Sequence, residues 1–317
     1  MYTCDYIVEC AQHHFGWNRD HRPVLEVDSG STVEFRVIDT AGGEITPAST
    51  LDDLNHLNRS RFTPLTGPVA IRDAMPGDAI RIKFLDFRLS GWGWSMVTPR
   101  YGLLADEFES PYLHLWNYDS SGSQPVDYKG IAQIPIRPFP GIIGLCPGEA
   151  GLHASLPPRN VGGNLDMKDL IRETSLLLPV ETPGALLSLG DTHAAQGHGE
   201  LAGTALESPM DVAVSVELVK EANIRGPELD IDAPLSRHVD SKGFHITCGV
   251  DSDLREAARI ATRNMIELFE RLHNIKAIDT YLLCSLCGDL CISELVNTPV
   301  NVVSLYFPKS VLTQSSP

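Results

Sequence analysis

The sequence predicts a mainly β protein, sandwich-like or barrel-like, with a smaller α/β element near the C-terminus. Many short segments alternate polar and apolar residues, glycine and proline turns join them, and a long helical pattern occurs only after residue 250. A chain of 317 residues can bury a large core. We expect one unit, 1–317, with an N-terminal β part (1–130), a β part carrying the candidate site (131–220) and an α/β part (221–317).

The first β part begins with alternating, β-branched segments that we expect to be strands, at 24–27, 31–37, 69–71 and 79–84. Turn signals lie between them at Asp28-Ser29-Gly30 and at Met75-Pro76-Gly77-Asp78. Residues 91–130 are aromatic-rich and irregular. They are compatible with a long loop over a pocket or over apolar surface.

The rest of the chain is loop-rich at first and helical near its end. Glycines and prolines interrupt 131–210, and 211–219 alternates as a clear strand. Apolar residues recur at three- and four-residue steps from Asp253 to His273, which predicts a helix with Asp251 or Ser252 as its cap. A second helix is expected from about Ile278 to Leu286.

The formal net charge of −16 argues against nucleic acid or an anionic membrane surface as a partner, because both require a cationic face. We find no stretch with the length and apolarity of a transmembrane helix. The N-terminus lacks a basic start followed by an apolar run. The expectation is therefore a cytoplasmic protein.

The chain has seven cysteines, an odd number that fits free thiols in a reducing compartment. Cys284 and Cys287 lie in an apolar segment and are expected to be buried structural thiols. Cys146 could be a nucleophile only with a base and a cationic partner in space, and no local signature supports this. Nucleophile-elbow, phosphate-loop and dinucleotide motifs are missing from the sequence.

The stretch from Asp191 to Glu200 concentrates acids and imidazoles after an apolar run. If the run continues as a strand, Asp191 and His193 point the same way, since side chains alternate along a strand. Gly197 and Gly199 allow a turn that brings Glu200 back towards them. Such a set could bind zinc or a similar ion, and it could equally be a polar turn between two strands.

Three other stretches compete for a site, and one of them, Cys146-Pro147-Gly148-Glu149, offers a thiol and a carboxylate. Asn164 and Asp166 follow a double glycine and are two residues apart, so they could share a face or simply form a capped turn. His13 and His14 are adjacent and precede Trp17; neighbours in a strand face opposite ways, so at most one of these two histidines reaches a given pocket.

Several segments together resemble the acetamidase/formamidase family. They occur in the family's order and cover almost the whole chain, at 14–17, 66–69, 76–78, 138–144, 162–166, 183–197 and 199–207. The resemblance implies a β-sandwich with added α/β elements, a homo-oligomer, and a divalent metal, zinc with calcium in some members. It implies hydrolysis of a small acyl amide to carboxylate and ammonia. The chain departs from the family pattern at His198, where aspartate is usual, which bears on metal stoichiometry.

From these motifs we expect Asp166, Asp191 and His193 to bind the metal. Glu200 would be a further ligand or the general base, with Glu149 as its substitute. Asn164 or a glycine-rich backbone amide would bind the oxyanion, while His14 and Trp17 would line the substrate pocket. Two alternatives remain: a calcium-stabilised β-sandwich that only binds a ligand, and a metal oxygenase with two histidines and one carboxylate.

Overall fold

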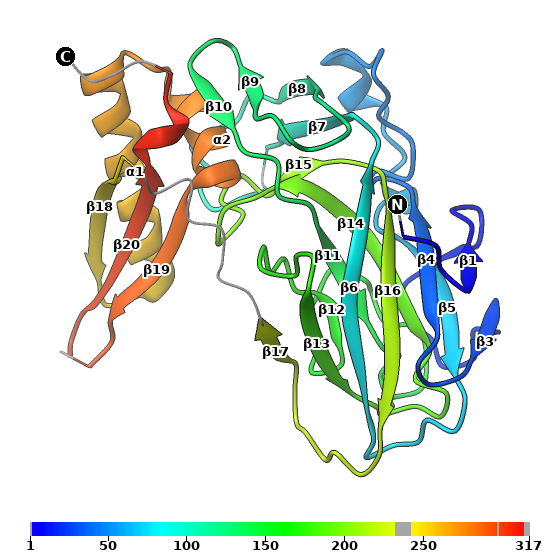
Figure 1. Cartoon of the computed structure of the whole chain (residues 1–317). Coiled ribbons are helices and arrows are strands. Elements are labelled where there is room, and N and C mark those ends of the chain that lie inside the picture. The colour runs from blue at the N-terminus through cyan, green and yellow to red at the C-terminus, as the bar shows by residue number, and fades with distance from the viewer. Residues whose placement is uncertain (1, 100, 232–241, 297, 314–317) are drawn as a thin grey trace.

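The chain folds as a β-sandwich with a small α/β unit at one side (Figure 1). The computed structural model describes residues 2–99, 101–231, 242–296 and 298–313. Among these residues, no helix has both the length and the apolarity needed to span a bilayer. The mainly β class expected from the sequence is confirmed.

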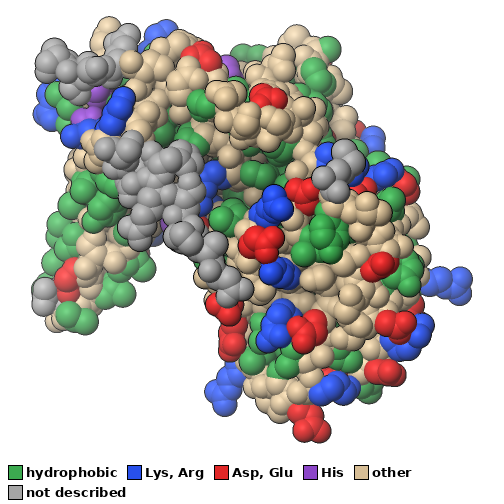
Figure 2. Space-filling view, viewed as in Figure 1, with side chains coloured by type: hydrophobic (Ala, Val, Ile, Leu, Met, Phe, Trp, Pro, Cys, Tyr) green, Lys and Arg blue, Asp and Glu red, His purple; other side chains and the backbone are tan. Residues whose placement is uncertain are grey.

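One layer of the sandwich is a sheet with the strand order β1-β4-β16-β6-β13-β17. Its strands are β1 (Tyr6–Val8), β4 (Thr32–Val37), β16 (Met210–Val219), β6 (Ala79–Leu89), β13 (Thr174–Pro179) and β17 (Glu228–Ile231). Ion pairs on neighbouring strands, Arg81–Glu217 at 2.8 Å and Arg88–Asp211 at 3.0 Å, lie on its solvent face. Figure 2 shows charges of both signs interspersed over this part of the molecule.

The second layer has the order β12-β11-β14-β15-β7-β8, and β5 pairs with β14 while β2 and β3 pair with β5. These strands are β12 (Gly162–Asn164), β11 (Phe139–Gly144), β14 (Leu187–Ala195), β15 (Leu206–Glu207), β7 (Trp92–Val97), β8 (Tyr112–Asn117), β5 (Pro64–Ile71), β2 (His13–Phe15) and β3 (Leu25–Val27). A hairpin of β9 (Val126–Tyr128) and β10 (Ala132–Ile134) stands apart from both sheets.

The core lies between the two layers. Alternate residues of β4 and β6, such as Phe35 and Phe84, join Leu187 and Leu189 of β14 in one cluster of fully buried side chains. The period-two pattern thus gives each sheet one apolar face, and burying both faces against each other removes them from water. The expected strands at 24–27, 31–37, 69–71, 79–84 and 211–219 all fall within or overlap observed strands.

The C-terminal unit is a sheet of β18 (Phe244–Asp251), β20 (Asn301–Pro308) and β19 (Asp289–Glu294) with α1 (Leu254–His273) packed on it. Its second helix is α2 (Ala277–Cys287). Gly249 allows close packing, since a Cβ there would collide with the carbonyl oxygen of Ala257 in α1. The 3-10 helices of the described chain include η1 (Asp52–Asn55), η2 (Arg59–Arg61) and η4 (Lys309–Val311).

Two expectations about local structure were wrong. The cap of α1 is Asp253, whose carboxylate accepts from the Glu256 N–H at 2.9 Å, so neither Asp251 nor Ser252 caps the helix. The segment 91–130 contains β7 and β8 rather than only a long loop. Gly93 is needed within β7, because a Cβ at this position would collide with the backbone of Glu207 in β15.

Candidate active site

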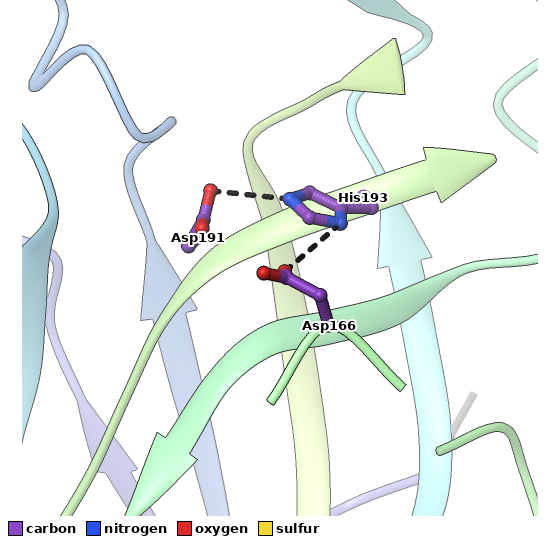
Figure 3. A group of neighbouring side chains, drawn as sticks. All are labelled: Asp166, Asp191 and His193. Carbon is purple, nitrogen blue, oxygen red and sulfur yellow. Dashed lines mark hydrogen bonds and ion pairs between the residues drawn. The ribbon is translucent and has the colours of Figure 1, made fainter. Parts of the chain in front are cut away.

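The site begins on β14, where Asp191 and His193 meet. His193 Nε2 lies 3.2 Å from Asp191 Oδ1, and both residues are almost completely buried (Figure 3). Asp191 has a φ of 51°, an unusual conformation for a residue with a side chain. The expected convergence of these two residues is therefore met, on a strand that is locally distorted rather than regular. Such distortion is typical of functional sites.

Asp166 approaches the same ring from the loop after β12. Its Oδ1 lies 3.9 Å from His193 Nδ1, on the opposite edge of the imidazole from Asp191 (Figure 3). The Asn164 Nδ2 donates to Asp166 Oδ2 at 2.9 Å, so these two residues do share a face. Asp166 also has a positive φ, of 48°. Two segments that are distant in the sequence thus converge on one histidine.

Two glutamates complete the cluster. Glu207 on β15 pairs in register with His193, and its Oε2 lies 3.2 Å from His193 Nε2. Glu200 returns to the cluster after the glycine turn, as expected. Sequence reasoning gave Glu207 no role, although it closes the stretch 199–207 that resembles the family. Only the pairing of β14 with β15 reveals its proximity to the ring.

These residues form two overlapping groups that could hold a cation. They are Asp166 with Asp191 and His193, and His193 with Glu200 and Glu207; within each, one ligand atom per residue lies within 4.8 Å of the others. Buried polar atoms in this region lack a hydrogen-bond partner, namely Asn164 Oδ1, Asp166 Oδ1 and His193 Nδ1. Leaving them unpaired is costly, and a divalent ion would satisfy several at once. The donor set therefore fits a divalent metal.

Burying four carboxylates around one imidazole perturbs their protonation. Burial raises the pKa of Asp166 to about 7, with His193 opposing and Asp191 adding to the shift. Burial likewise raises the pKa of Glu207 to about 7. The pKa of Glu200 is raised well above its ordinary value by burial and by Asp166. Burial acts to raise the pKa of Asp191, but His193 together with hydrogen bonds to Thr40 and Glu207 lowers it overall. Without a cation, the cluster therefore retains protons at neutral pH.

A cavity of about 120 Å³ opens onto these carboxylates. Asn164, Asp191, Glu200 and Glu207 line one part of it, together with Thr204. The other lining residues are Thr40, Arg59, Phe62, Thr63, Trp94, Met96, Thr98, Tyr101, Leu156 and Gly203. The acidic cluster is thus accessible to a small molecule.

Three sequence candidates lie outside this lining. His14 Nε2 bonds to Ser188 Oγ at 2.9 Å, and burial lowers its pKa to about 4. Trp17 packs with Leu65 and Ile142 in the core. Glu149 is exposed on a bend. The structure therefore does not bring His14 and Trp17 into this cavity or Glu149 into the cluster, because their β-strand and loop positions direct them elsewhere.

His198, where the chain departs from the family pattern, also points away from the cluster. Its Nε2 lies 3.6 Å from Asp169 Oδ2, and its backbone N–H donates to Asp289 at 3.1 Å. It belongs to neither of the two groups that could hold a cation. The side chain at position 198 therefore lies beside Asp169 and outside the acidic cluster.

The cysteines carry no sign of activation. All seven are free thiols. Cys146 is buried, and this burial raises its pKa to about 11, the opposite of what a nucleophilic thiolate requires. Cys284 is fully buried in α2, as expected of a structural thiol.

The loop that carries Glu200 is held by the C-terminal unit. Ser285 Oγ of α2 accepts from the Ala202 N–H at 3.1 Å and donates to the Thr204 carbonyl at 2.7 Å. The Tyr281 hydroxyl donates to the Leu201 carbonyl at 2.5 Å. A Cβ on Gly197 would collide with Gly288. The α/β unit thus helps to define the geometry of the site.

We predict that Ser285→Ala lowers the free energy of unfolding by about 1–3 kcal/mol, because it leaves a buried N–H and a buried carbonyl unpaired. Denaturant unfolding measures the change. Ser293→Ala is the matched control, since Ser293 is exposed on the neighbouring β19. Equal stability of the two variants would contradict the bracing role of Ser285.

One known protein family matches almost the whole chain. The model of the Acetamidase/Formamidase family matches residues 7–155 and 149–314. A putative formamidase of Schizosaccharomyces pombe is 26% identical over 270 residues, covering 65% of this chain and 64% of that protein. The chain therefore spans less than two thirds of the length of this curated relative.

Two solved structures share the fold. An acetamidase from Bacillus halodurans is 30% identical, with a TM-score of 0.68, and the alignment covers 95% of this chain and 96% of that one. A gamma lactamase from Delftia acidovorans is 22% identical with a TM-score of 0.89, covering 98% and 94% of the two chains.

Proposed function

Because the chain belongs to the acetamidase/formamidase family, we propose that it hydrolyses short linear acyl amides to a carboxylate and ammonia. The observation that carries the proposal is the buried cluster of His193 and four carboxylates at the end of a small cavity. Water adds to the amide carbon, the carbon–nitrogen bond breaks, and the nitrogen leaves with a proton taken from the water.

Asp166, Asp191 and His193 would hold a divalent ion, with Glu207 as a further candidate ligand. We propose zinc, with calcium as a possible second ion, within the homo-oligomer that the resemblance implies. Bound there, the ion supplies Lewis acidity, which polarises a carbonyl and lowers the pKa of a bound water to near 7.

The residues around the proposed metal site would have different roles in the reaction. Glu200 would accept the proton of the attacking water and pass it to the leaving nitrogen. The Asn164 side chain would donate a hydrogen bond to the developing oxyanion. Asn164 also borders Asp166, so its orientation is restrained.

The direct test combines metal analysis of the purified protein with ammonia release from formamide and acetamide, with and without a chelator. We expect bound divalent metal and ammonia release that a chelator abolishes. Metal-loaded protein that releases no ammonia from any short amide would refute the hydrolytic function. Activity that survives complete metal removal would refute the metal dependence.

A pH dependence follows from the raised pKa values of Asp166 and Glu207, both about 7. In metal-free protein, these groups lower the free energy of unfolding as pH rises from about 4 to about 7, because the unfolded chain ionises first and the folded chain holds the protons longer. A divalent cation binds the ionised form of these carboxyl groups. We therefore predict a larger rise in Tm on adding Zn²⁺ at about pH 7.5 than at about pH 5.5, measured by calorimetry. An equal or smaller rise at the higher pH would contradict this.

A further inference from the structure

The cavity has an apolar wall that hydrolysis of the smallest amides would not need. Phe62, Trp94, Met96 and Leu156 all line it. Trp94 and Met96 are almost fully buried and belong to a separate apolar cluster, which Phe62 joins. Leu156 is 49% exposed and forms the solvent side of this wall.

The apolar wall extends from the acidic residues in a defined direction. Glu207 pairs in register with Trp94 across β15 and β7. Trp94 and Met96 lie at alternate positions of β7, and Thr98 follows directly after the strand. All three line the cavity, so they form one face that leads away from Glu207. The Met96 backbone is held by Thr204, which accepts from its N–H at 3.1 Å and donates to its carbonyl at 2.7 Å. A substrate with its amide at the acids would place its acyl chain along this face.

The volume decides how long that chain can be. The cavity measures about 120 Å³. An apolar cavity of about 150 Å³ accommodates benzene, which has about six non-hydrogen atoms. Formamide, with three, would leave much of this space unfilled, whereas propionamide and butyramide approach the available size.

Among the residues that the structure describes, Arg59 of η2 is the one charged lining residue away from the acids. Its side chain is exposed, and its guanidinium carbon lies 6.0 Å from the centroid of the Phe62 ring. Arg59 is thus held at the solvent side of the wall by an aromatic contact rather than in the apolar interior. The interior is suited to an uncharged acyl chain.

Resting on the proposed function, we infer that the preferred substrates are neutral aliphatic amides with three or four acyl carbons, rather than formamide or acetamide. The wall formed by Phe62, Trp94, Met96 and Leu156 sets this preference. Binding energy from the acyl chain then contributes at the reacting amide, so shorter substrates lose turnover as well as affinity.

The test measures kcat/KM of the metal-loaded protein for linear amides from formamide to hexanamide. We expect kcat/KM to peak at propionamide or butyramide, at least about tenfold above formamide, and to fall at hexanamide. A maximum at formamide or acetamide overturns this inference and leaves the hydrolytic function standing. Ammonia release from none of them overturns the hydrolytic function itself.

Two controls separate the wall from other causes. Leu156→Ala should lower the butyramide-to-formamide ratio of kcat/KM about tenfold. Leu152 is an exposed leucine outside the lining, so Leu152→Ala should leave that ratio unchanged.

The second control compares two substrates of similar shape. Isovaleramide should be preferred over malonamate, its carboxylate isostere. A preference for malonamate would assign the specificity to Arg59 and overturn the apolar assignment.

Discussion

Replacing His193 by alanine should abolish metal binding and reduce ammonia release by more than about a hundredfold. Both groups that could hold a cation contain this residue, so its loss removes the imidazole ligand from each. Changes to groups that merely support metal ligands already cost about 10–100-fold in affinity or activity. Metal content by elemental analysis and ammonia release by a coupled assay give independent measurements.

The matched control is Glu149→Gln, because Glu149 is exposed and lies outside both groups. This variant should retain metal and activity. It therefore tests whether the general base is Glu200 in the cluster or Glu149, the alternative that the sequence offered. A His193→Ala protein that keeps its full metal content and rate would eliminate the proposed metal ligands. A circular dichroism spectrum like that of the parent protein would show that any loss arises in the site and not in the fold.

Gly141→Ala should have the second largest effect, although Gly141 has no side chain to contribute. A Cβ at this position of β11 would lie 2.6 Å from His193 Cε1, 2.7 Å from Asp166 Oδ1 and 2.8 Å from the Asp191 carbonyl oxygen. One of these neighbours is backbone, so the strain falls on the histidine ring and the carboxylate. We expect loss of bound metal, at least about a tenfold loss of activity, and a destabilisation of about 1–3 kcal/mol.

Gly226→Ala provides the comparison, since a Cβ there would have no atom within 4 Å and the residue has no positive φ. It should leave metal content, activity and Tm unchanged. Unchanged metal content and activity in Gly141→Ala would mean that the approach of β11 to the histidine is not required for the site.

The local part of the site could be predicted because it depends on spacing along one segment. Asp191 and His193 are two residues apart on an extended chain, and Asn164 and Asp166 have the same spacing. Both pairs do make contact. The helix from Leu254 to His273 was predictable for a related reason, since its apolar residues repeat with the helical period.

Other residues could not be placed from spacing. Glu207 reaches His193 only through the register of β14 and β15. His14 and Trp17 were expected in the pocket, but the pairing of β2 with β5 and the core contacts of Trp17 direct them elsewhere. Glu149 carries the same chemical group as Glu200, yet the fold leaves it exposed.

The sequence by itself determined the mainly β class, the C-terminal helices and which neighbouring residues of a segment share a face, because these follow from repeat periods and turn residues. Only the tertiary structure decided that Glu207 joins the other acidic residues around one histidine and that β7 supplies an apolar wall beside them. The register and packing of distant strands result from burial of the whole core, which no local pattern encodes.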